Sequence, residues 1–207
     1  MTAPMRNLST LLALLLVLVV APACAQHPGP QDSQWQRLDA GEPAPRFSLV
    51  DQNGKRVALT DFRGTAIIVT FLYTQCTDVC PVLPQMLARV DQQFSEVERE
   101  RFRFVGISVD PRRDTPQQLK AFLRERGLSE SRWTLLTGSV KELTQVATDY
   151  GVVVRPDPRG DLVHNTVFVL IDAAGWEHVE FHGLATPTAE IAKAVRSLIA
   201  PKAARKR

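Results

Sequence analysis

An apolar run at residues 66–72, Ala-Ile-Ile-Val-Thr-Phe-Leu, constrains the fold more than any other feature of the chain. It is rich in β-branched residues, and polar residues do not alternate with apolar ones, which is typical of a strand buried on both faces of a sheet. Two cysteines, Cys76 and Cys80, follow directly, with three residues between them. The pattern predicts a central strand that leads into a pair of thiols.

Strand and helix patterns alternate along the rest of the chain. Asn53-Gly54 lies between two short apolar segments and predicts an opening β-hairpin. Further strands are expected at 102–109, 133–136, 166–171 and 176–181, and helices at 81–94, 115–126, 139–150 and 186–199. Capping patterns predict that the last three helices start at Thr115, Ser139 and Thr186. The alternation predicts an α/β domain whose mixed sheet is covered by helices on both faces. Residues 176–181 are expected at the sheet edge, and residues 151–163 as a long loop.

The amino terminus predicts a segment that is separate from the fold. One basic residue precedes an apolar run at residues 8–21, shorter than the about 20 residues that span a bilayer. We interpret residues 1–25 as an export signal that is cleaved after Ala25, which places the mature protein in the periplasm. The alternative is cleavage before Cys24 and a lipid on that cysteine, which would attach the protein to the outer face of the inner membrane.

The remaining sequence divides into three parts. Residues 26–45 are polar and rich in proline, and predict a flexible linker. Residues 46–200 are long enough for one domain with a full core. Residues 201–207 form a basic tail, which we interpret as a solvated end. The net charge of +3 is too small to favour nucleic-acid binding, which needs a concentrated basic face.

The two thiols at the expected strand-to-helix junction can serve redox or metal chemistry. The positive end of a helix dipole favours the thiolate form, which is both the nucleophile and the metal ligand. A disulfide between Cys76 and Cys80 would close a very short loop and add little stability. A purely structural cross-link is therefore disfavoured, and the pair alone does not decide between redox and metal.

His164 is the third candidate for the same site. It lies two residues before the strand expected at 166–171, and ligands of open α/β sheets gather at strand ends. Together with Cys76 and Cys80 it would form a site of two sulfurs and one nitrogen, which suits Cu(I) through the thiolates and Cu(II) through the imidazole. Zinc would normally recruit a fourth protein ligand in a structural site. The alternative for His164 is a capping or core residue bonded to the loop.

Other polar residues carry weaker signals. His178, Glu180 and His182 share one face of the last expected strand by period two. A second metal site is one interpretation, and we favour a solvated face. Asp78, between the thiols, is either a carboxylate beside the metal or an exposed loop residue.

Three segments give the chain a resemblance to the Sco/SenC family of copper-binding, thioredoxin-like proteins. They are residues 71–81 (FLYTQCTDVCP), residues 105–116 (VGISVDPRRDTP), and His164 with residues 167–172 (VFVLID). The resemblance extends over residues 47–198, nearly the whole expected domain. It implies a thioredoxin-like fold that binds one copper, as Cu(I) or Cu(II), through Cys76, Cys80 and His164.

The resemblance also implies a role in building the CuA centre of cytochrome c oxidase subunit II. The expected partners are that subunit and other periplasmic copper chaperones or thiol reductants. The expected activity is that of a copper chaperone, without turnover of its own, that delivers copper or reduces the cysteines of the target. The alternative is a thiol-disulfide oxidoreductase or redox sensor without copper delivery. Such an oxidoreductase would show a Cys-x-x-Cys spacing, and an X-Pro pair where this chain has Asn165-Thr166.

Some residues depart from the family pattern. Thr77 stands where the family usually has proline, which would fix the backbone of the ligand loop. Leu72 replaces a common glycine, and Val163 stands where the family usually has aspartate, so a carboxylate beside the expected metal is missing. Residues 110–114 match the family. We interpret them as a salt-bridged turn and helix cap, with docking of the partner as the alternative.

Overall fold

The apolar run forms strand β4 (Ala66–Leu72), in which every residue is buried. In the computed structural model, the described residues are 35–76, 82–158 and 161–200. Residues 32–207 belong to one structural unit. The predicted export signal, the basic tail at 201–207 and residues 77–81, which include Cys80 and Asp78, lie outside the described residues. β4 confirms the predicted central strand.

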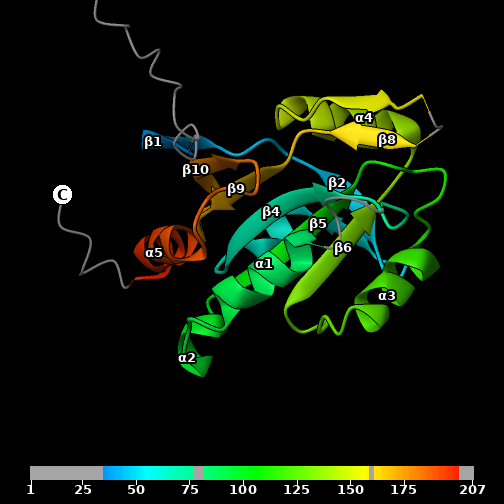
Figure 1. Cartoon of the computed structure of the whole chain (residues 1–207). Helices are drawn as coiled ribbons and strands as arrows, with labels where there is room; N and C mark the ends of the chain where they lie inside the picture. The colour runs from blue at the N-terminus through cyan, green and yellow to red at the C-terminus, as the bar shows by residue number, and fades with distance from the viewer. Residues whose placement is uncertain (1–34, 77–81, 159–160, 201–207) are drawn as a thin grey trace, which may run out of the picture. The chain divides into compact units, whose positions relative to one another are not determined.

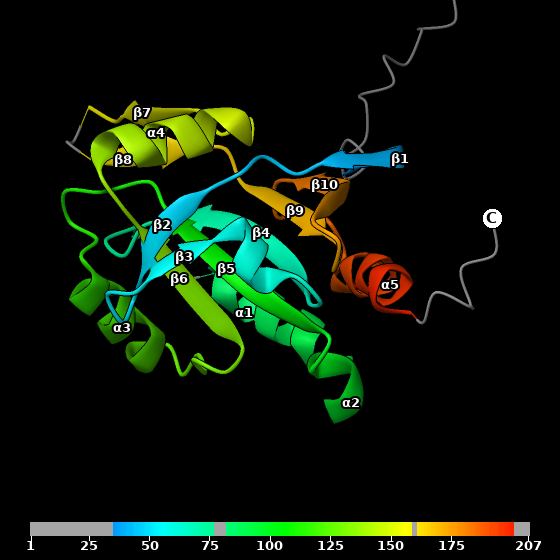
Figure 2. The same ribbon diagram turned by 180° about the vertical axis from the view of Figure 1, so that it is seen from behind.

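The described strands form one large sheet and one small one. The large sheet adds β1 (Trp35–Pro43), β2 (Ser48–Asp51), β3 (Arg56–Ala58), β5 (Phe102–Ser108), β6 (Trp133–Thr137), β9 (Val167–Ile171) and β10 (Trp176–His182). Its order is β1-β10-β9-β4-β5-β6-β2-β3 (Figures 1 and 2). β5 runs parallel to both β4 and β6, and the other neighbours are antiparallel, so the predicted mixed sheet is confirmed.

Helices cover both faces of the sheet. They are α1 (Val82–Asp91), α2 (Glu96–Arg99), α3 (Pro116–Glu125), α4 (Val140–Asp149) and α5 (Thr188–Ile199). The crossovers β4-α1-β5 and β5-α3-β6 run in the same direction across the sheet, and right-handed connections place both helices on one face. α5 packs beside α1 on that face, and α4 lies on the opposite face (Figures 1 and 2).

Helix starts follow the predicted capping patterns at two places. The side chains of Thr115 and Ser139 accept hydrogen bonds from the backbone N–H three residues later. At the last helix, Thr186 was the predicted cap, but the N-cap residue is Pro187 and no side chain caps the helix. The hydroxyl of Thr186 is buried and has no hydrogen-bond partner among the described residues.

The structure differs from the prediction at one edge of the sheet. Part of the predicted flexible linker 26–45 forms β1, which pairs antiparallel with β10. β10 is therefore an inner strand and not the predicted edge strand. The register of β1 shifts between Arg37 and Glu42, and Gly41 in this stretch has a φ of 67°. A bulge with glycine in the left-handed region interrupts the two-residue period, so the sequence shows no strand pattern there.

The predicted long loop at 151–163 also contains strands. β7 (Val154–Pro156) pairs antiparallel with β8 (Leu162–His164) and forms the small separate sheet. Strands of three residues are too short to show a period of two, and their prolines suggested a loop. Among the described residues, no helix has the length and apolar character needed to cross a membrane.

Gly106, at the centre of β5, is packed against side chains of both neighbouring strands. A Cβ at this position would lie 2.6 Å from Leu135 Cδ2 and 2.9 Å from Leu72 Cδ2. Leu72, the residue that replaces a common glycine of the family pattern, thus fills space that Gly106 leaves open. The large side chain of Leu72 and the missing side chain of Gly106 thus compensate each other in volume.

We expect Gly106→Ala to lower the free energy of unfolding by about 2 kcal/mol, because the added methyl group overpacks a fully buried site. Urea unfolding followed by circular dichroism measures the change. The matched test is a cycle with Leu135→Ala, since shortening the nearer side chain makes room for the methyl group. The double variant should lose less stability than the sum of the single variants. Strict additivity would contradict this packing explanation.

Candidate metal centre

The antiparallel pairing of β4 with β9 brings the two predicted ligand segments to one end of the sheet. Thr70 of β4 pairs with Phe168 of β9, and the Thr70 hydroxyl donates to the carbonyl oxygen of Val167 at 3.0 Å. The carboxyl end of β4, which leads to Cys76, therefore lies beside the amino end of β9, which follows His164. Residues far apart in the sequence meet at this end.

Tyr73 contacts both predicted ligands that the structure describes. Its ring meets the imidazole of His164 edge to face, with the ring centroids 6.2 Å apart. Its hydroxyl donates to the carbonyl oxygen of Leu162 at 2.8 Å, and its own carbonyl oxygen accepts from the backbone N–H of Cys76 at 3.3 Å. Burial raises the pKa of this hydroxyl above its usual range, and the interaction with Cys76 adds to the shift. Tyr73 thus keeps its proton and remains a donor at neutral pH.

His164 is held in a tautomer that suits a metal ligand. Its Nδ1 lies 3.0 Å from the carbonyl oxygen of Asn165, so the proton that satisfies this contact is on Nδ1. The lone pair is then on Nε2. Metal-binding histidines commonly donate their second N–H to a backbone carbonyl or a carboxylate in this way. The contact fits both a ligand and a histidine bonded to the loop, so the ligand role of His164 stays a prediction.

The described residues hold only part of the predicted ligand set. Cys76 is 8% exposed, and its backbone N–H donates to the carbonyl oxygen of Tyr73 at 3.3 Å. Cys80 lies outside the described residues. Within the described ranges, no three His, Cys, Asp or Glu side chains are grouped so that they could hold a metal ion. The set of Cys76, Cys80 and His164 therefore stays a prediction.

The histidines of β10 do not converge on a shared site. His178 Nε2 lies 3.0 Å from Asp172 Oδ2, and His182 Nε2 lies 3.3 Å from Glu180 Oε2. Each imidazole thus has its own carboxylate, and no three possible metal ligands of the described residues gather here, which disfavours a second metal site.

Asp114 fixes the backbone that precedes Cys76. Its carboxylate accepts hydrogen bonds from the backbone N–H of Thr74 at 3.1 Å, from the Thr74 hydroxyl at 2.6 Å and from the Ser108 hydroxyl at 2.6 Å. Asp114 is 1% exposed, and burial raises its pKa although these hydrogen bonds oppose the shift. Sequence reasoning assigned Asp114 only to a turn and helix cap. It missed Asp114 and Tyr73 as supports of the site, because neither residue type in its local context indicates such distant partners.

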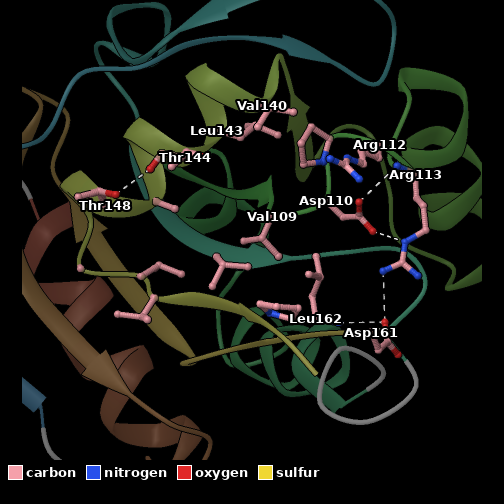
Figure 3. A pocket seen from close by; sticks show the side chains of 17 residues that line it. Val109, Asp110, Arg112, Arg113, Val140, Leu143, Thr144, Thr148, Asp161 and Leu162 are labelled. Carbon is pink, nitrogen blue, oxygen red and sulfur yellow. Dashed lines mark hydrogen bonds and ion pairs between the residues drawn. The ribbon is translucent and has the colours of Figure 1, made fainter. Parts of the chain in front are cut away.

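The predicted salt-bridged turn at residues 110–114 is confirmed and extends to β8. The guanidinium of Arg113 pairs with Asp110 and lies 3.2 Å from Asp161, which directly precedes β8 (Figure 3). The same guanidinium lies over the ring of Tyr73, 5.7 Å from its centroid. Arg113 thus ties the β7–β8 hairpin to the loop after β5.

A cavity of about 840 Å³ lies beside this turn, between α4, the loop after β5 and the β7–β8 hairpin (Figure 3). Its lining is mainly apolar, with Val109, Leu143 and Leu162 among the contributing residues, and it is charged where Asp110 and Arg113 meet. The cavity is adjacent to the residues that hold β8. Docking of a partner at residues 110–114 stays a prediction.

Comparison with known proteins identifies the family of this chain. The family model SCO1/SenC matches residues 36–200. The chain belongs to the SCO1/SenC family. This confirms the resemblance seen in the cysteine motif and the Asp-Pro-Arg-Arg-Asp-Thr-Pro segment.

Relatives of known sequence and structure agree with the SCO1/SenC assignment. The SCO1 protein homolog of Bacillus subtilis is 29% identical over 155 residues, which are 73% of this chain and 80% of the relative. The chain spans only 41% to 59% of the length of four further curated relatives.

Two solved Sco structures confirm the predicted thioredoxin-like fold. ScoI of Arabidopsis thaliana with copper bound is 30% identical, with a TM-score of 0.66 over 74% of this chain and 96% of that structure. BsSco is 27% identical, with a TM-score of 0.69 over 81% of this chain and 99% of that structure. BsSco is a member of the Sco family of cytochrome c oxidase assembly proteins in which a disulfide switch was identified.

Proposed function

We propose that this protein binds one copper ion through Cys76, Cys80 and His164 and serves the assembly of the CuA centre of cytochrome c oxidase. The observation that carries the proposal is the pairing of β4 with β9, which puts the Cys76 loop beside His164 while Nδ1 of the imidazole is occupied. The copper-bound ScoI structure supports the choice of metal, and the family role of BsSco supports the assembly function.

The donor set fits copper as a cargo that must be bound and then released. Two thiolates hold Cu(I), and an imidazole adds affinity for Cu(II). The near-complete burial of Cys76 shields its sulfur from solvent oxidants, and Tyr73 keeps a hydroxyl beside it. The partner that we propose is subunit II of the oxidase. Export to the periplasm, through the signal at residues 1–25 or with a lipid on Cys24, would put the protein in the compartment of that partner.

The same thiols support a second act, reduction of the target's cysteines. One thiolate of the Cys76–Cys80 pair attacks a disulfide of the target and forms a mixed disulfide, and the second thiol resolves it. Two electrons and two protons leave the pair, which becomes a disulfide, and the target gains two thiols. The disulfide switch of BsSco is the observation that favours this second role.

Copper binding by the reduced mature protein, residues 26–207, tests the proposal. We expect one copper per chain after anaerobic competition with a chelator. Cys76→Ser and Cys80→Ser should abolish retention, and His164→Ala should weaken binding of Cu(II) by at least about tenfold, because a ligand is lost. His178→Ala is the matched control, since this histidine pairs with Asp172 after the carboxyl end of β9, the opposite end of that strand from His164, and it should bind copper as the wild type does.

Two results would contradict the proposal. They are failure of the reduced protein to retain copper, and retention that is indifferent to His164. Mixing the protein with the soluble domain of subunit II then distinguishes copper delivery from reduction of the target's cysteines. Copper found on the reduced target supports delivery, whereas loss of the Cys76 and Cys80 thiols with an equal gain of thiols in an oxidised target supports reduction.

A further inference from the structure

His164 lies on a short element that few contacts hold in place. β8 has three residues, and its partner β7 is equally short and is not paired to the large sheet. Besides that pairing, Asn165, which follows β8, binds the backbone of Gly151 and Val153. In the part of the chain that the structure describes, two side-chain contacts reach the start of β8. One is the ion pair of Arg113 with Asp161, and the other is the hydrogen bond from the Tyr73 hydroxyl to the carbonyl oxygen of Leu162. The position of His164 depends on these few contacts.

Only the second of these contacts also reaches the cysteine loop directly. Tyr73 lies three residues before Cys76 and its carbonyl oxygen accepts from the Cys76 backbone N–H, while its hydroxyl binds the carbonyl of Leu162. The ring of Tyr73 meets the imidazole of His164. Tyr73 is 3% exposed, so its ring is held by the core. A single fixed side chain thus joins both described ligand segments.

We infer that Tyr73 is a positioning residue of the copper site, whose hydroxyl sets the separation between Cys76 and His164. This inference rests on the proposed function, because it assigns Tyr73 a role in that same site. Without the hydroxyl, β8 loses its tie to the cysteine loop, while both thiols remain. Cu(II) depends on the imidazole more than Cu(I) does, because thiolates alone suit Cu(I). Tyr73 therefore affects how tightly the site binds Cu(II) relative to Cu(I).

Tyr73→Phe removes the hydroxyl and keeps the ring, and the chain offers a matched control. Its other tyrosine, Tyr150, is 2% exposed and donates to the carbonyl oxygen of Pro45 at 2.8 Å. Tyr150→Phe thus deletes the same kind of buried hydrogen bond, and its lost partner is a carbonyl outside β8. Both variants should lose similar stability, so an effect of the missing bond on folding alone appears equally in both.

The experiment measures the affinities for Cu(I) and Cu(II) by anaerobic competition with chelators, with thiols counted before and after. We expect Tyr73→Phe to weaken Cu(II) binding about tenfold, as loss of a group that orients a ligand typically does, and Cu(I) binding less than about twofold. Tyr150→Phe should change neither affinity by more than about twofold. In the metal-free protein, amide hydrogen exchange of β8 should be faster in Tyr73→Phe than in Tyr150→Phe.

Several outcomes would overturn the inference. They are unchanged Cu(II) affinity in Tyr73→Phe, equal weakening of both copper ions, or the same selective loss in Tyr150→Phe. If the wild-type protein retains no copper, the proposed function fails, and amide exchange alone decides whether Tyr73 positions β8. Equal exchange in the two variants would then refute that positioning.

Discussion

Asp114→Ala will lower the free energy of unfolding by about 3 to 4 kcal/mol, because it leaves one buried and two partly buried donors without their acceptor. The carboxylate binds the backbone N–H and hydroxyl of Thr74 and the hydroxyl of Ser108, and it is 1% exposed. An alanine fills none of the space and accepts no hydrogen bond. Urea unfolding followed by circular dichroism measures the loss.

A surface aspartate supplies the control for this variant. Asp149 is exposed and accepts one hydrogen bond, from Gln145 in the same helix. Asp149→Ala should therefore cost less than about 1 kcal/mol. If Asp114→Ala cost no more than Asp149→Ala, the carboxylate would not be the anchor of the segment before Cys76.

Stability will fall as the pH rises through the range from about 4.5 to about 7, because of Glu177. Burial raises the pKa of this carboxyl from 4.5 to about 7, and the negative charges of Glu180 and Glu42 add to the shift. In the unfolded chain the group has its ordinary pKa, so the folded protein holds the proton in this range and the unfolded protein does not. The stabilisation is complete below pH 4.5 and is lost above pH 7.

The loss of stability between pH 4.5 and pH 7 should be about 2 to 3 kcal/mol. A pKa shift corresponds to about 1.4 kcal/mol per unit, and we reduce the result because Glu177 is coupled to Glu180. Glu177→Gln should flatten the change between pH 4.5 and pH 7 and should be more stable than the wild type at pH 8. Glu100→Gln, which changes an exposed glutamate, should leave the pH profile as it is. Urea unfolding at several pH values measures the free energy of unfolding of each variant. A wild-type profile that rises with pH over this range would exclude a dominant role for Glu177.

The sequence predicted the parts of the fold that local patterns determine. The buried run of β4, the caps at Thr115 and Ser139 and the hairpin at Asn53-Gly54 each depend on neighbouring residues, and all are present. β1 and the β7–β8 hairpin were not predicted, because a bulge or a three-residue strand leaves no periodic signal. β1 forms because β10, which is distant in the sequence, offers an edge to pair with, whereas β7 and β8 pair with each other.

In the candidate site, too, local patterns predicted some residues and not others. The motif predicted Cys76 and Cys80, and the strand that follows His164 predicted the end of the sheet at which it lies. The roles of Tyr73 and Asp114 depend on Leu162, Ser108 and other residues that are remote in the sequence. An aspartate is usually exposed, so nothing in its local context indicated a buried acceptor. Polar networks of this kind can be recognised only from the folded structure, in which the distant donors and acceptors meet.

Thr70 helps to set the alignment of β4 with β9, and with it the position of the proposed ligand His164. It is a polar residue with no exposed surface in an otherwise apolar strand, and its hydroxyl reaches only one carbonyl of β9, that of Val167. A slip of β9 by one residue would shift His164 by about 3.3 Å along β4 and would turn the side chains of β9 to the opposite face. It would also bury the hydroxyl without a partner. The spacing of the proposed ligands Cys76 and His164 therefore depends on the alignment of two core strands, which this buried hydrogen bond favours.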